Sequence, residues 1–235
     1  MIDKDKTKKY LKYAIGEIIL VVIGILIALQ INNWNENRLE KIQESKILAN
    51  LHIEFDENLK NLLYVDSILN NTAQSIDIIF SQFGKDTFDF NEYEIDSLLS
   101  NCLNSPTWSP SEFVLNDLKN SGGLSKLHNE ELKKLLFQWS RFFSQLSEIQ
   151  LQIENTNLDL IRFIKDNASL RNIDVFSRRF KHPPSTLFNQ NASLLSSYRF
   201  ENYIDDKYYV LNSAKSEYKD AKELIIRILK ETENK

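Results

Sequence analysis

Residues Tyr10 to Trp34, YLKYAIGEIILVVIGILIALQINNW, form the longest apolar stretch of the chain. Between Ala14 and Ile31 only Glu17 and Gln30 interrupt it with a charged or amide side chain. At about 1.5 Å per residue, a helix over this segment is roughly 27 Å long, close to the hydrocarbon thickness of a bilayer. The sequence therefore predicts one membrane-spanning helix near the N-terminus.

Both ends of this stretch carry residues that are typical of a membrane boundary. Tyr10 and Tyr13 on one side and Trp34 on the other fit the interfacial positions of aromatic anchors. The residues before the stretch are rich in lysine, whereas those after it are mostly asparagine. Lysine-rich flanks stay in the cytoplasm, so we expect a cytoplasmic N-terminus and a C-terminal part on the other side of the membrane.

Two other interpretations of the same stretch are weaker. A cleaved secretory signal usually has a shorter apolar region and an A-x-A-like cleavage site, and Ala28-Leu29-Gln30 followed by Ile31 is a poor context for cleavage. A buried helix of a soluble protein is also less expected, because this long apolar segment lacks the polar face that a surface helix shows. Both comparisons favour a permanent anchor.

The segment KYLKYAIGEIILVVIGILIALQINNWNENR contains Gly16-Glu17, Val22-Ile23-Gly24-Ile25 and a polar end from Gln30 to Glu36. A looser block lies from Pro110 to Trp139, where a helix is expected to end at a glycine before a leucine-rich helix. These two regions resemble a family of small single-pass inner-membrane proteins from Bacteroidota, catalogued as a domain of unknown function. The resemblance implies an inner-membrane protein with a mostly helical periplasmic part, and it implies no catalytic residue.

No glycine or proline occurs after Ile25 and before Gly84, so the membrane helix is expected to continue as a stalk. Along it, apolar or small residues recur in steps of three and four, which is typical of a helix packed along another helix. The members are Leu48, Leu51, Phe55, Leu59, Leu62, Val65, Leu69, Ala73, Ile76, Phe80 and Phe83. Ile53, Leu63, Ile68 and Ile79 widen this stripe, which favours a bundle within the chain over an intermolecular coiled coil but leaves both possible.

Breaks in the pattern divide the next part of the chain. The long helix is expected to end at Gly84, and a short helix to run from 91 to 102. Ser109, Pro110 and Glu112 predict a capping box that opens a helix ending before Gly122-Gly123.

Two longer helices are predicted beyond these glycines. Asn129 is the expected N-cap of the first, with the buried face Leu132, Leu135, Leu136, Trp139, Phe142, Phe143, Leu146, Ile149, Ile153, Leu160 and Ile164. From Ala168 to Ser197 the pattern decays, and an exposed loop is expected to contain Arg178, Arg179, Lys181, His182, Pro183 and Pro184. The last helix, roughly 205 to 231, has an apolar side at Leu211, Ala214, Tyr218, Ala221, Ile225 and Ile228.

The predicted class is all-α, with an N-terminal transmembrane helix that continues toward an extramembrane antiparallel helical bundle. Residues 1–13 are interpreted as a basic cytoplasmic tail, 14–34 as the transmembrane helix and 35–235 as a periplasmic helical-bundle domain. A net charge of −4 without a large basic face makes nucleic acid an unexpected partner. The single Cys102 cannot form an internal disulfide.

Polar and small residues within the span are the first candidates for a function. A carboxylate within a bilayer is energetically costly, so Glu17 indicates either ion coupling or a solvated position near the cytoplasmic boundary. Gly24 and Ala28 form a small-residue groove in which a second helix can pack closely, and Gln30 could hydrogen-bond to such a partner. We therefore expect a homo-oligomer or a membrane-protein partner, with a monomeric anchor as the alternative.

The sequence predicts no catalytic, cofactor-binding or metal-binding residue. None of the three histidines lies in a zinc-binding spacing, and no nucleophile elbow, phosphate loop or dinucleotide fingerprint occurs. Aromatic residues such as Trp108 and Trp139 are expected in the core, with a ligand pocket as the alternative. An enzyme of an unrecognised kind remains a minor alternative.

These features favour a non-enzymatic interaction, scaffold or assembly subunit that is anchored in the inner membrane. We expect the lipid bilayer to surround its anchor, and we expect no cofactor. One alternative is a periplasmic sensor or ligand-binding module that signals through the stalk, for which the few residues before the span are too short to form an effector. Another is an ion-coupled auxiliary subunit that uses Glu17.

Overall fold

The computed structural model describes the backbone of residues 4–177 and 181–233, and the side chains of these residues from Ile15 onward. The described residues contain helices and no strand, which confirms the predicted all-α class. The α-helices are α1 (Lys4–Phe80), α2 (Glu92–Cys102), α3 (Phe113–Asn120), α4 (Glu130–Asn167), α5 (Leu170–Asp174) and α6 (Tyr198–Thr232), and two 3₁₀ helices are η1 (Gly123–Lys126) and η2 (Asn191–Ser196).

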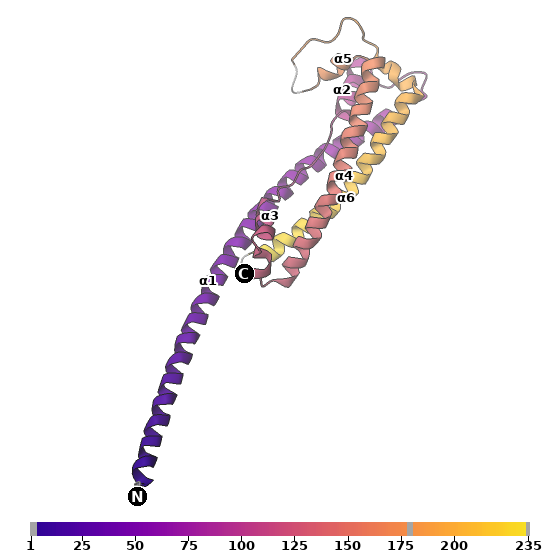
Figure 1. Ribbon diagram of the computed structural model, residues 1–235. Coiled ribbons are helices and arrows are strands. Elements are labelled where there is room, and N and C mark those ends of the chain that lie inside the picture. The colour runs from indigo at the N-terminus through magenta and orange to yellow at the C-terminus, as the bar shows by residue number, and fades with distance from the viewer. Residues whose placement is uncertain (1–3, 178–180, 234–235) are drawn as a thin grey trace.

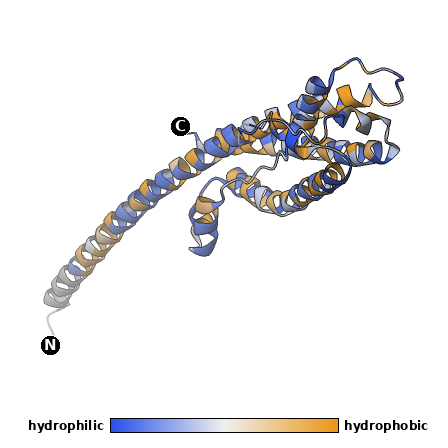
Figure 2. Cartoon of the chain, turned by 90° about the horizontal axis from the view of Figure 1, so that it is seen from above, coloured by the Kyte–Doolittle hydropathy of each residue, from blue (hydrophilic) through white to orange (hydrophobic). Residues whose placement is uncertain are grey.

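Helix α1 is one unbroken helix of 77 residues, about 115 Å long, and its N-terminal part stands clear of the rest of the molecule (Figure 1). No glycine or proline interrupts its second half, so no residue breaks the backbone hydrogen bonds between the apolar segment and the bundle. Every described side chain from Ile15 to Gln43 is exposed, including the hydrophobic ones (orange in Figure 2). The predicted continuation of the anchor as a stalk is therefore present as a single helix.

The other end of α1 packs along α6, and α6 packs along α4, so that the three long helices form a bundle (Figure 1). Helix α6 runs antiparallel to α1, because His52 meets Thr232 at one end and Phe83 meets Phe200 at the other. It also runs antiparallel to α4, as the contact between Asn129 and Glu231 shows. Helices α1 and α4 consequently run in the same direction.

This parallel arrangement is possible because the chain returns along α1 before α4 begins. Helix α2, an irregular segment over residues 103–112 and α3 make the return. Within that segment Pro106, Trp108 and Pro110 are buried while Ser105 and Ser109 are exposed, the alternation that an extended chain produces. The Trp108 side chain thereby enters the core.

Large aromatic side chains fill the centre of the bundle. The Trp139 ring packs edge-on against Phe55 with centroids 5.1 Å apart, and against Trp108 at 6.1 Å. Trp108 in turn packs against Tyr218 at 6.0 Å. All four side chains are almost fully buried, so the prediction that Trp108 and Trp139 belong to the core is confirmed.

The predicted core face of α1 is only partly correct. Leu51, Phe55 and other members of the narrow seam are buried, and Ile79 is buried beside them. Ile53 and Leu63 are exposed instead, at 58% and 44%. They do not widen the core face, because the helices packed on α1 leave these two side chains uncovered.

The predicted capping box before α3 is wrong. The helix begins at Phe113, and the side chain of Glu112 at the N-cap position makes no capping hydrogen bond. Glu54 of α1 takes that role: its carboxylate accepts from Val114 N at 3.1 Å and from Leu115 N at 3.3 Å. A proline favours extended backbone in the residue before it, so Pro110 belongs to the extended segment and the helix starts later.

The other predicted helix starts agree with the structure more closely. Asn91 forms a reciprocal capping box with Glu94 at the start of α2, and Asn129 accepts from Leu132 N at the start of α4. Helix α6 begins before the predicted position, because Ser197 caps it. Its predicted apolar side is buried, as is that of α4 apart from the half-buried Phe142 and Phe143.

Candidate functional site

One helix among the described residues is long and apolar enough to cross a membrane. Its most apolar window has a mean hydropathy of 2.3 and none of it is buried inside the molecule. A core helix of a soluble protein would satisfy the same length and composition, but its side chains would be covered. The exposure of Ile18 (63%) and Leu20 (73%) therefore favours lipid as the surrounding medium.

The structure places the predicted membrane residues on more than one side of α1. Gly24 and Ala28 are four residues apart and share a face, and Glu17, seven residues before Gly24, lies on the same face. Gln30 is rotated away from Ala28 by about 160° at about 100° per residue, so it lies on the opposite side of the helix. Gln30 can therefore not bond to a helix that packs on Gly24 and Ala28.

Of the predicted interfacial anchors, Trp34 is exposed at 67%. Tyr10 and Tyr13 belong to helix α1, but their side chains lie outside the described residues. Apart from its chain neighbours and the nearby backbone of its own helix, no described atom lies within 4 Å of the position that a Cβ at Gly24 would take. No contact among the described residues therefore requires a small residue there.

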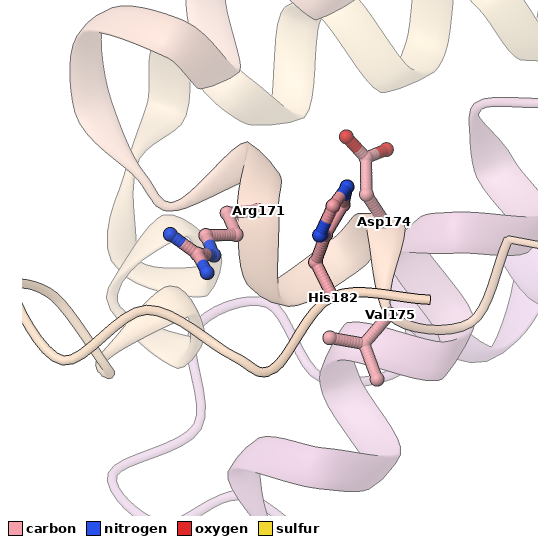
Figure 3. A pocket seen from close by; sticks show the side chains of 4 residues that line it. All are labelled: Arg171, Asp174, Val175 and His182. Carbon is pink, nitrogen blue, oxygen red and sulfur yellow. The ribbon is translucent and has the colours of Figure 1, made fainter. Parts of the chain in front are cut away.

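The far end of the bundle carries a hollow of about 350 Å³ between α5 and the loop that follows it (Figure 3). Arg171, Asp174 and Val175 line it from α5 and its end, and His182 lines it from the loop. Arg171 Nε donates to the Pro183 carbonyl at 2.9 Å, which holds the loop against α5. Burial raises the pKa of the Asp174 carboxyl group.

The predicted exposed loop agrees with these positions in part. Lys181, His182, Pro183 and Pro184 are exposed, whereas the predicted Arg178 and Arg179 lie outside the described residues. The hollow combines a guanidinium, a carboxyl and an imidazole group over the apolar side chain of Val175. Such a lining can bind a small polar molecule. The sequence did not indicate it, because helical periodicity does not predict how the loop folds back against α5.

A buried amide holds the segment beside this hollow. The Asn191 side chain donates to Asp96 Oδ1 at 2.6 Å and accepts from Ser169 N at 2.7 Å. Its bonds join α2, the start of α5 and η2. Burial raises the pKa of Asp96, and the hydrogen bond from Asn191 opposes this shift.

A second hollow, of about 290 Å³, lies between α1 and α6. Leu62, Leu63 and Asp66 line it from α1. From α6 come Lys215, Ser216, Tyr218, Lys219 and Lys222. The predicted stripes did not indicate this groove, because its lysines occupy an edge of α6 beside the core face.

Lys207 of α6 is the most unusual residue of the core, because its side chain is fully buried. Its Nζ donates to the Asn104 carbonyl at 2.9 Å and to Asn157 Oδ1 of α4. Burial lowers the pKa of Lys207 to about 7 and raises the pKa of the nearby Cys102 thiol to about 12. No carboxylate among the described residues forms an ion pair with Lys207.

The described histidine, cysteine, aspartate and glutamate side chains form no group of three or more that could hold a metal ion. The residues above thus define a helical bundle built on a helix that is long enough and apolar enough to cross a membrane. A family described as "Family of unknown function (DUF6090)" has a model that matches residues 17–105.

The matched residues cover most of the apolar stretch, the stalk, the α1 side of the core and α2. The resemblance to a family of unknown function is therefore confirmed for this region, whereas the block from Pro110 to Trp139 lies beyond the match. No curated protein matches the chain, and neither does any solved structure.

Proposed function

We propose that this chain is a single-pass protein of the inner membrane that acts as an interaction, scaffold or assembly subunit and not as an enzyme. Lipid surrounds residues 14–34, and residues 1–13 lie in the cytoplasm. Residues 35–235 form a helical domain in the periplasm. The lysine-rich N-terminal flank supports this orientation.

The observation that carries the proposal is the continuity of α1. The same helix provides the apolar segment and one of the three long helices of the bundle. The bundle begins at Glu44, whose carboxylate accepts a hydrogen bond from His128 N. The exposed helix between Trp34 and Glu44 is about 15 Å long. A stalk without a break holds the bundle at a fixed height above the membrane, as an assembly subunit requires.

Cysteine labelling in right-side-out inner-membrane vesicles tests the orientation. Ser125 is exposed at the end of the bundle nearest the stalk, and Thr7 precedes the apolar stretch. With a membrane-impermeant maleimide, Ser125→Cys should react in intact inner-membrane vesicles of native orientation, whereas Thr7→Cys should react only after permeabilisation. The native Cys102 is buried and provides the unreactive background. The reverse pattern, or release of the chain by an alkaline wash, would refute the anchored arrangement.

The proposed partner within the membrane is a second copy of α1 or the helix of another protein, packed on the face of Gly24 and Ala28. Small residues let two helices approach closely, and among the described residues no other element comes within 4 Å of a Cβ placed at Gly24. Gly24→Leu/Ala28→Leu should reduce chemically crosslinked complexes several-fold. Ile23→Leu/Ile27→Leu, which alters another face, should leave them unchanged, and equal effects of the two changes would remove this interface.

The hollow at α5 supports a second candidate, a sensor or ligand-binding module that signals through the stalk. Its polar lining, Arg171, Asp174 and His182, is brought together from two segments by the fold (Figure 3). Retention of a small molecule by the full chain in mild detergent, and its loss in Arg171→Ala, would favour this function. The ion-coupled role of Glu17 stays a prediction from the sequence.

A further inference from the structure

The groove between α1 and α6 has a basic edge and an apolar base. Lys215, Lys219 and Lys222 are exposed and follow one another in steps of four and three along α6. This spacing places the three ammonium groups on one face of the helix. Opposite them, Leu62 and Leu63 provide the apolar surface from α1.

The positive charge of this edge is not neutralised within the described chain. No ion pair joins the three lysines to a carboxylate among the described residues, whereas lysines elsewhere, such as Lys60 and Lys133, pair with neighbouring acids. Among the described residues that line the groove, Asp66 is the one with an acidic side chain. Three lysines and one aspartate give this lining an excess of positive charge, although the chain as a whole has a net charge of −4.

The walls of the groove are held by the core. The Tyr218 hydroxyl donates to the Pro106 carbonyl at 2.8 Å, and Leu62 is 1% exposed. Leu63 is exposed at 44% beside these fixed walls. The groove thus exists before a partner binds, and a partner would cover Leu63 without displacing core residues.

We propose that this groove binds an amphipathic helix of a partner protein that carries carboxylates at the same four-and-three spacing as Lys215, Lys219 and Lys222. Such a helix places apolar residues over Leu63 and its carboxylates beside the ammonium groups. The inference rests on the proposed function, for which it gives the chemistry of the partner.

The position of the groove along α1 favours protein over lipid as the source of the negative charge. Leu62 follows Trp34 by 28 residues, which in one continuous helix corresponds to about 42 Å. Lipid headgroups next to Trp34 cannot reach that height above the membrane. A helix of a neighbouring protein can.

The test uses the full-length chain in mild non-ionic detergent and a fluorescent synthetic peptide of about 18 residues. The peptide carries Glu at positions i, i+4 and i+7 and Leu on the adjoining face, and a control peptide carries Gln in place of Glu. Fluorescence anisotropy should show saturable binding of the Glu peptide only. Binding should weaken as the salt concentration rises, because exposed charges are screened.

Charge reversal then distinguishes binding at the groove from nonspecific electrostatic binding to the rest of the surface. Lys215→Glu/Lys219→Glu/Lys222→Glu should weaken binding at least about tenfold, as expected when three favourable ion pairs become repulsive. The matched control changes the net charge equally at exposed sites outside the groove: Lys126→Glu/Lys165→Glu/Lys230→Glu. The control should change affinity less than about twofold, and circular dichroism should show that both variants remain helical.

Two results would overturn the proposal. One is the absence of saturable binding of the Glu peptide to the unmodified chain, and the other is an equal loss in both triple variants. Neither result bears on the membrane anchor, which the labelling of Ser125→Cys and Thr7→Cys tests separately. Failure of the groove and failure of the proposed function can therefore be distinguished.

Discussion

Replacement of the buried lysine should change how the stability of the bundle depends on pH. The pKa of Lys207 falls from 10.5 to about 7 on folding, because burial disfavours the charged amine. Each unit of this difference in pKa is worth about 1.36 kcal/mol. At a pH where Lys207 is protonated in both the folded and the unfolded chain, burial of the charged amine therefore lowers the free energy of unfolding by about 5 kcal/mol.

The sign follows from proton binding. Between pH 7 and pH 10.5 the unfolded chain holds a proton on Lys207 that the folded chain has released, so the free energy of unfolding rises with pH in this window. From pH 7 to pH 9 this one group should add about 2 kcal/mol. Well below pH 7, Lys207 is protonated in both the folded and the unfolded chain, so its contribution to the free energy of unfolding no longer depends on pH.

Lys207→Met keeps the length of the side chain and removes the titration. Denaturant unfolding of the full chain in mild detergent, followed by the fluorescence of the buried Trp108 and Trp139, measures the free energy of unfolding at pH 7, 8 and 9. The difference between the unmodified chain and the variant should rise by about 2 kcal/mol over this range. A difference that stays constant would refute the reasoning.

Two further variants serve as controls for this result. Lys215→Met removes an exposed lysine and should leave the pH dependence as it was. Asn157→Asp places a carboxylate beside Lys207, which should raise the pKa of the amine and move the pH-dependent window to more alkaline values. The rise between pH 7 and pH 9 should then shrink even if Lys207→Met fails to fold.

Three simpler predictions follow from the packing. Glu54→Gln should lower the free energy of unfolding, measured by denaturant unfolding, by about 1–3 kcal/mol, because the charged cap of α3 is lost. Glu57→Gln, at an exposed site, should change it by less than about 0.5 kcal/mol. Equal effects of the two changes would contradict the capping role of Glu54. In the same measurement, Phe55→Ala should lower the free energy of unfolding by about 3–5 kcal/mol, because the side chain is fully buried. Ile53→Ala, on the exposed face of α1, should lower it by less than about 1 kcal/mol, and a large effect of this change would show that Ile53 belongs to the core. Cys102, with its pKa raised to about 12 and its side chain buried, should react with maleimide only after unfolding, and fast labelling of the folded chain at pH 7 would show that this part of the bundle opens.

Local signals in the sequence were enough to predict several features of this protein. The apolar stretch, the absence of helix breakers after Ile25 and the cap at Asn129 depend on residues close together in the chain. The buried stripes of α4 and α6 could be predicted for the same reason, because helical periodicity repeats within each segment. These signals suffice for the helical class and for the candidate membrane helix.

Tertiary structure alone decided the features that join distant segments. Glu54 caps α3 across 60 residues of sequence, and Lys207 is buried because Asn104 and Asn157 meet its amine from other elements. The exposure of Ile53 was also decided there, since the helices packed on α1 leave this side chain uncovered. Periodicity gives the faces of a helix, but only packing determines which face is covered and which polar groups come together in the interior.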